Sequence, residues 1–118
     1  MTRQHLRQSA LERVVLREGA WFDVPGSALR QDGKIYPLAA LEHLLLLDLA
    51  EHRGTQRAMA DLLLSVWGDD REPEFGPHTV RCLGTRLRRR LAMVGCRDLI
   101  PNSRGKSGLM LLAQNRDD

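Results

Sequence analysis

Aromatic residues, long apolar runs and cysteines are all scarce in this chain. Phe, Trp and Tyr make up 4% of its 118 residues, so a buried core has to be built mainly from Leu and Val. The run from Leu44 to Leu47 is far shorter than the roughly 20 apolar residues needed to cross a bilayer, and the N-terminus leads into no signal-like stretch. Cys82 and Cys96 match neither a disulfide framework nor a zinc motif. We therefore expect one cytoplasmic domain with reduced thiols and no membrane partner.

Sequence motifs that identify enzymes are also absent. The four histidines form no HExxH or similar metal spacing, and neither GxSxG, a Walker sequence nor GxGxxG occurs. We therefore expect no enzyme activity, with no catalytic residue, no metal and no cofactor.

Charge is distributed unevenly along the chain. Residues 1–77 hold nine Lys and Arg against twelve Asp and Glu, whereas residues 78–106 hold eight Lys and Arg against one acid. The overall charge of +3 hides this polarity. A basic segment of this kind favours a polyanionic partner, although a solvated basic face is the simpler alternative.

The first third of the chain has the pattern of short antiparallel strands. Four apolar segments end at glycine- or proline-containing turns, and they cover residues 14–16, 20–24, 27–30 and 34–36. The sequence Gln31-Asp32-Gly33-Lys34 is a strong hairpin signal. Residues 1–12 are polar and read as an arm or a short first helix that begins at a capping box, Ser9 to Glu12.

Three helices are expected next. In the first, leucines recur at three- and four-residue spacing, Glu42, Glu51 and His52 fall outside their stripe, and His43 lies at its boundary. The second begins after Thr55, buries one apolar stripe and stops at Gly68; the stripe comprises Met59, Leu62, Leu63 and Val66. The third runs from about His78 to Val94, with Pro77 at its entry and Gly95 at its end.

The remaining segments are an acidic loop and a C-terminal hairpin. Residues 68–77 form a loop by composition. Residues 98–100 and 109–112 are expected to be strands joined by the basic, glycine-containing turn 102–108. The whole pattern predicts an arm at 1–12, one α+β domain at 13–113 and a tail at 114–118.

The third helix separates apolar and basic residues. With about 100° of rotation per residue, Val80, Leu83, Gly84, Leu87 and Leu91 cluster on one face. The opposite face carries His78, Cys82, Thr85 and Arg89, while Arg81 and Arg88 flank it on one side and Arg86 on the other.

An arginine-rich helix without acids suits double-stranded DNA. The segment 81–90 has five arginines, no lysine and no acid, whereas solvated helices usually interleave acids for i,i+4 pairing. The major groove admits one α-helix, and Arg can bind guanine O6 and N7 through two hydrogen bonds. Arg104 and Lys106, in the basic turn, could grip phosphates or enter a minor groove.

Four segments together resemble the effector domain of OmpR/PhoB-type response regulators. Residues 38–45, LAALEHLL, look like the family's L-T-x-x-E-[FY]-x-L-L, and residues 62–68, LLLSVWG, look like its L-L-x-x-V-W-G. Residues 78–91, HTVRCLGTRLRRRL, look like its recognition helix, R-T-V-D-V-H-I-x-R-L-R-x-K-L, and residues 104–108, RGKSG, look like its wing, R-G-x-G-Y. The order and the spacings agree together.

The resemblance implies a winged helix-turn-helix fold: a three-helix core, an N-terminal antiparallel sheet and a C-terminal β-hairpin wing. It implies a bacterial, sequence-specific transcriptional regulator, with its recognition helix in the major groove and its wing in a minor groove. By motif position the helix contacts are Thr79, Cys82, Thr85, Arg86, Arg88 and Arg89, and the wing contacts are Asn102 and Arg104; Arg81 and Lys106 are added from charge and position alone. It further implies RNA polymerase contact through the 68–77 loop. We also expect the protein to bind DNA as a homodimer or in tandem on repeated half-sites.

Departures from the family pattern leave alternatives open. The family's Asp-Val-His is Arg81-Cys82-Leu83 here, so base preference should differ. Gly84 replaces a β-branched residue and should allow a neighbouring helix to come closer. No receiver domain is expected before the arm, so we expect either a stand-alone effector or a signal that arrives through a regulatory protein partner. A protein-interaction adaptor that no longer reads DNA is the main alternative, and an oxidation-sensitive Cys82 is a minor one.

Overall fold

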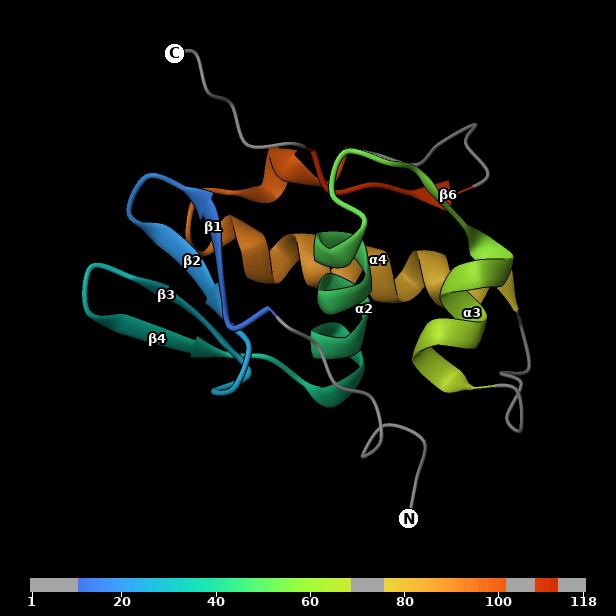
Figure 1. Ribbon diagram of the computed structural model, residues 1–118, viewed down its shortest axis with the longest axis horizontal. Coiled ribbons are helices and arrows are strands. Elements are labelled where there is room, and N and C mark those ends of the chain that lie inside the picture. The colour runs from blue at the N-terminus through green and yellow to red at the C-terminus, as the bar shows by residue number, and fades with distance from the viewer. Residues whose placement is uncertain (1–10, 69–75, 102–107, 113–118) are drawn as a thin grey trace.

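The computed structural model describes residues 11–68, 76–101 and 108–112 (Figure 1). In these ranges an N-terminal sheet lies at one end of the molecule, α3 lies at the other, and α2 and α4 cross between them. The α+β architecture matches the fold class expected from the sequence. Among the described residues, none of the helices combines the length and the apolar character that crossing a bilayer requires.

The N-terminal sheet contains the four expected strands. They are β1 (Arg13–Arg17), β2 (Ala20–Asp23), β3 (Ala28–Gln31) and β4 (Lys34–Pro37), each antiparallel to the next. Asp32 and Gly33 have φ of 51° and 81°, as a two-residue type I′ hairpin turn requires. Alternate residues such as Val14, Leu16 and Phe22 are buried, so one face of the sheet packs on the helices.

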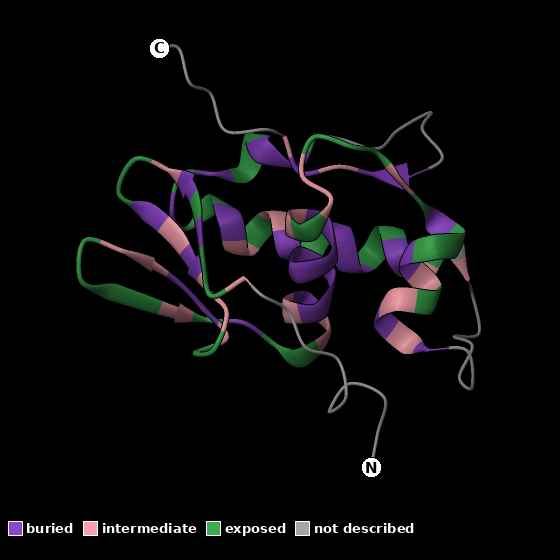
Figure 2. Cartoon of the chain, in the orientation of Figure 1, coloured by how far each residue is buried: buried purple, intermediate pink, exposed green. Residues whose placement is uncertain are grey.

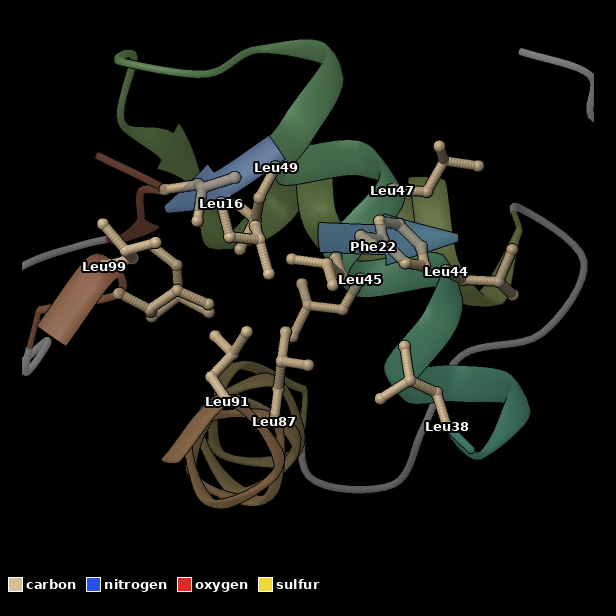
Figure 3. Close-up of a cluster of buried hydrophobic side chains, with 14 of the residues drawn as sticks. Leu16, Phe22, Leu38, Leu44, Leu45, Leu47, Leu49, Leu87, Leu91 and Leu99 are labelled. Carbon is tan, nitrogen blue, oxygen red and sulfur yellow. The ribbon is translucent and has the colours of Figure 1, made fainter. Parts of the chain in front are cut away.

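Three helices follow, and they are α2 (Ala40–Glu51), α3 (Met59–Trp67) and α4 (Pro77–Ala92). Their leucines meet the sheet in one core, in which Leu87 and Leu91 of α4 face Leu45 of α2 (Figure 3). The expected stripe of α3 faces this core as well, with Met59, Leu62 and Val66 buried and Leu63 half-buried against it. Buried and exposed residues alternate along α4, as expected for a helix with one solvent face (Figure 2).

The expectation that Glu42 lies outside the buried stripe of α2 is wrong. Glu42 is buried, and its Oε1 accepts hydrogen bonds from the backbone N–H of Ala39 and from Arg90 Nε, both at 3.0 Å. The first bond satisfies a backbone donor at the helix N-terminus, where an acid is favourable. The second holds α4. Helix α2 is central, so its apolar stripe alone does not define its buried surface.

The C-terminal region departs from the expected hairpin. Residues 98–100 are not a strand, because Arg97–Leu99 form a 3₁₀ helix, η1. It follows the turn after α4, in which Gly95 has φ +70°. The other expected strand reduces to β6 (Gly108–Leu109). The two segments still meet, since Leu112 N–H donates to the carbonyl of Leu99 at 2.8 Å.

Strand β6 pairs with a strand that the sequence did not predict. The pair β5 (Arg57–Ala58) and β6 is antiparallel, with Arg57 opposite Leu109 and Ala58 opposite Gly108. Helix α3 therefore begins at Met59, later than the expected start after Thr55. This short sheet brings the C-terminal segment against the helix-turn-helix.

Candidate nucleic-acid interface

Helix α4 folds as the sequence predicts. Pro77 stands in its first turn, where the missing N–H costs nothing. Its apolar face is closed, since Val80, Leu83, Leu87 and Leu91 are each at most 1% exposed. This face packs against α2 and α3 and thereby fixes which side of the helix looks outward.

The outward side of α4 carries most of the predicted helix contacts. It exposes Arg81, Cys82, Thr85, Arg86 and Arg89, together with His78, while Thr79 is half-buried. Three guanidinium groups, a hydroxyl and a thiol thus share one side of one helix. A surface of this composition can donate hydrogen bonds to phosphate oxygens and to base edges.

Neighbouring turns of the helix organise two of these side chains. The Thr85 hydroxyl donates to the carbonyl of Arg81 at 3.2 Å, which leaves its oxygen free to accept a further bond. Cys82 Sγ lies 3.4 Å from His78 Nε2, one turn earlier. Both contacts run along the exposed side of α4 and hold its small polar groups in place.

Arg88 and Arg90 bind partners within the protein. Arg88 is half-buried, and its Nε donates to the carbonyl of Ile100 at 2.9 Å. Arg90, which was not among the predicted contacts, pairs through its Nε with the buried carboxylate of Glu42. Helical periodicity reveals neither partner, because the local sequence shows neither the direction of a carbonyl nor an acid 48 residues away.

The residue that packs against Gly84 belongs to a strand, β6, and not to a neighbouring helix. A Cβ atom on Gly84 would lie 3.1 Å from Leu109 Cδ1, so the side chain of β6 rests directly on α4. The expectation that a neighbouring helix fills this space is therefore wrong. A Cβ on Gly108 would lie 1.9 Å from the carbonyl oxygen of Arg57, which only glycine avoids.

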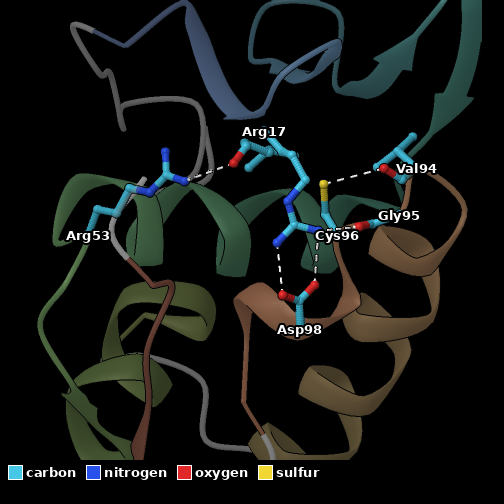
Figure 4. Close-up of polar contacts among 7 residues, drawn as sticks. Arg17, Arg53, Val94, Gly95, Cys96 and Asp98 are labelled. Atoms are coloured by element: carbon cyan, nitrogen blue, oxygen red, sulfur yellow. Dashed lines mark hydrogen bonds and ion pairs between the residues drawn. The ribbon is translucent and has the colours of Figure 1, made fainter. Parts of the chain in front are cut away.

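The C-terminal end of α4 is anchored to the sheet (Figure 4). The Arg17 guanidinium binds both carboxylate oxygens of Asp98, at 3.0 and 2.8 Å, and also the carbonyl of Gly95. The hydrogen bonds from Arg17 hold the pKa of Asp98 below its ordinary value. Between these groups, burial raises the pKa of the Cys96 thiol, which donates to the carbonyl of Val94 at 3.4 Å.

The predicted wing contacts Asn102, Arg104 and Lys106 lie outside the described residues, and so do residues 69–75 of the acidic loop. Within the described ranges, no three His, Cys, Asp or Glu side chains gather as metal ligands would.

Comparisons with known proteins give structural relatives. No family model matches the chain, and neither does any curated protein sequence. The C-terminal domain of NsrR, a lantibiotic response regulator of nisin resistance, aligns with a TM-score of 0.65 at 26% identity, over 82% of this chain and 95% of that one. The DNA-binding domain of E. coli CadC aligns with a TM-score of 0.68 at 20% identity, over 87% and 94%.

A third relative belongs to the streptococci and is described as one of a novel family of redox sensors that evolved from two-component response regulators. It aligns with a TM-score of 0.69 at 22% identity over 95% of this chain, but this chain spans only 46% of that protein. The three are described as a response regulator, a DNA-binding domain and a redox sensor. The chain thus has the α+β winged-helix fold predicted from its sequence, the fold of response-regulator C-terminal DNA-binding domains.

Proposed function

We propose that this protein is a DNA-binding transcriptional regulator that places α4 in the major groove of double-stranded DNA. The observation that carries the proposal is the outward side of α4, which exposes Arg81, Arg86 and Arg89 on a helix without a single acid. Each cation close to a phosphate releases counterions, and this release supplies affinity that salt weakens.

Sequence reading would come from the side chains at the centre of this surface. Arg86 and Arg89 are exposed and long enough to bind a guanine edge through two hydrogen bonds. Thr85 and Cys82 lie near them, with a hydroxyl oxygen that can accept a bond and a small apolar sulfur that can contact a thymine methyl. Thr79, in the first turn, suits a phosphate contact, because helix N-termini favour anions.

The remaining contacts of the proposal rest on the sequence alone. Asn102, Arg104 and Lys106 would reach a neighbouring minor groove from the wing. The 68–77 loop would contact RNA polymerase, and a regulatory protein would deliver the signal to a cytoplasmic, bacterial regulator. Two copies would bind repeated half-sites about one helical turn apart.

A salt titration with the purified full chain tests the general proposal. Fragmented genomic DNA and a random duplex library are bound at low salt, and the dissociation constant is followed as salt increases. We expect binding that weakens steeply with salt, and enrichment of one sequence family from the library. No detectable binding at low salt would refute DNA recognition and favour the adaptor alternative. Salt-sensitive binding without enrichment would refute sequence specificity alone.

A further inference from the structure

The residues that flank segment 102–107 on both sides rest on the same edge of α4. Ile100, two positions before the segment, meets Arg88, and Leu109, two positions after it, meets Gly84. Gly84 and Arg88 are four residues apart, so they lie one helical turn apart on one side of the helix. The helix proposed to read DNA therefore also contacts the described residues on both sides of the expected wing.

At the leading end, α4 contributes a hydrogen bond from a side chain. Arg88 Nε donates to the carbonyl of Ile100 at 2.9 Å, and the Ile100 side chain is fully buried. The neighbouring carbonyl, that of Leu99, accepts the N–H of Leu112 at 2.8 Å. The Arg88 bond thus fixes the point at which the chain leaves the domain after Ile100.

The returning end is held by close backbone packing. Gly108 lies so near the carbonyl of Arg57 that no Cβ fits between them, and Leu109 fills the space that the missing side chain of Gly84 leaves. This end needs no hydrogen-bonding side chain from α4. In contrast, the leading end at Ile100 is bound by Arg88, which the sequence predicts to be a DNA contact.

We infer that Arg88 is a positioning residue, which holds Ile100, at the root of the expected wing, against the recognition helix rather than reading a base. This inference rests on the proposed function and assigns one arginine within it. An Arg that reads guanine must be able to turn its planar fork toward the base edge. The Nε–H of Arg88 is already directed at Ile100, which restricts that plane.

Two substitutions separate positioning from charge. In Arg88→Gln the amide nitrogen stands where Nε stood, so the donor to Ile100 is kept while the positive charge is lost. In Arg88→Met the side chain has about the length of glutamine, but the donor and the charge are both lost. Comparing the two variants therefore isolates the hydrogen bond, and wild-type full-length chain is the reference.

Two measurements report on these variants. The first is amide hydrogen exchange of Leu112 in the DNA-free protein, which follows the root of the segment. The second is the base-pair profile and the affinity on duplexes enriched from a random library by the wild-type chain. We expect Arg88→Met to raise the rate of amide exchange at Leu112. It should also reduce the sequence preference at the base pairs that flank the most strongly preferred ones, and weaken the affinity for DNA about five- to tenfold. Arg88→Gln should retain the exchange and the flanking preference.

The opposite patterns overturn the inference. Equal loss in both variants would make Arg88 a phosphate grip, and loss of preference at one central base pair in both would make it a base reader. Unchanged exchange at Leu112 in Arg88→Met would show that the bond to Ile100 holds nothing in place. Failure of the wild-type chain to enrich any duplex would instead remove the proposed function, and the exchange data would still decide whether the bond fixes the segment root.

Discussion

Arg57 grips the buried carboxylate of Asp48 with two hydrogen bonds, 2.8 Å from Nε to Oδ1 and 3.1 Å from the terminal nitrogen to Oδ2. Asp48 lies in α2 and is 2% exposed, whereas Arg57 lies in β5, beside the strand that follows the expected wing. Burial acts to raise the pKa of Asp48, but the bonds from Arg57 help to outweigh it and hold the pKa below 3.8.

Removing the Asp48 charge should therefore destabilise the fold. Asp48→Asn removes the buried carboxylate that Arg57 binds and leaves it the exposed Asp61, 3.8 Å away, so we expect a loss of about 3–5 kcal/mol in the free energy of unfolding. Because the folded pKa is lowered, the wild-type contribution is present above pH 3.8 and is lost as the pH falls below it. Urea denaturation between pH 2 and pH 7 should show this loss in the wild type and a flatter acid profile in Asp48→Asn. If the stability of the two proteins fell equally with decreasing pH, the lowered pKa of Asp48 would not be the source of this acid sensitivity.

Arg53 should be a second point of structural sensitivity, because it joins three segments. Its guanidinium donates to the carbonyls of Leu112 at 2.8 Å, Val15 at 2.6 Å and Leu16 at 3.3 Å. Val15 and Leu16 belong to the edge strand β1, and Figure 4 shows Arg53 beside this strand. We expect Arg53→Met to destabilise by about 2–4 kcal/mol, because partly buried carbonyls lose charged donors.

Arg53→Lys is the matched variant for this site. It keeps the charge but cannot span three acceptors, so its stability should lie between those of the wild type and Arg53→Met. Chemical denaturation measures all three proteins. A lysine variant as stable as the wild type would show that charge rather than the fork geometry matters at this position.

Gly84 should tolerate only a small side chain. Gly84→Ala gains about 1 kcal/mol of helix propensity, but its Cβ crowds Leu109, so we expect a net change smaller than that gain. Gly84→Ile has to displace the buried Leu109 and should destabilise by about 1–3 kcal/mol. Adding Leu109→Val to Gly84→Ile should recover part of the loss, as thermal or urea denaturation will show. An isoleucine variant as stable as the wild type would contradict the close packing of β6 on α4.

The two cysteines should differ sharply in reactivity. Cys82 is exposed on α4 and Cys96 is buried, so a thiol reagent should label one thiol in the native chain and the second only after unfolding. Cys82→Ser should abolish native labelling, and an enriched duplex should protect Cys82. Equal labelling of both thiols in the native protein would contradict the placement of Cys96.

Burial also raises the pKa of Cys96 above 9.0, so the neutral thiol is the form that the fold prefers. Its contribution to stability is complete below pH 9.0 and is lost as the pH rises above it. Cys96→Val should therefore reduce the loss of stability at alkaline pH, as measured by urea denaturation at pH 7 and pH 10.

Local sequence patterns correctly predicted the four strands of the N-terminal sheet and helix α4. The four strands follow alternation and turn chemistry, as the φ angles at Asp32 and Gly33 illustrate, and α4 follows its leucine spacing. Glu42 was misplaced because its burial depends on Arg90, 48 residues away, and on the central position of α2. Residues 98–100 were expected to be a strand because Leu99 and Ile100 are apolar. In the structure Arg97–Leu99 instead form the 3₁₀ helix η1, which follows the turn after α4.

The candidate site shows the same division. Helical periodicity placed Cys82, Thr85, Arg86 and Arg89 on the outward side, where the structure has them exposed. Periodicity could not distinguish Arg88 from these neighbours, because its bond to Ile100 depends on how the chain turns after α4. The long arginine side chain can serve either the protein or a ligand, and tertiary structure decides between them.

The most direct test of DNA reading by α4 compares Arg86→Ala and Arg89→Ala with Lys34→Ala on an enriched duplex and on random DNA. Each variant loses one positive charge, but Lys34 is exposed on β4, in the N-terminal sheet. We expect each α4 variant to lose about 1–3 kcal/mol of binding free energy on the enriched duplex and much less on random DNA, whereas Lys34→Ala should bind both as the wild type does. Equal effects of all three substitutions on both DNAs would contradict the central claim that the outward side of α4 reads sequence.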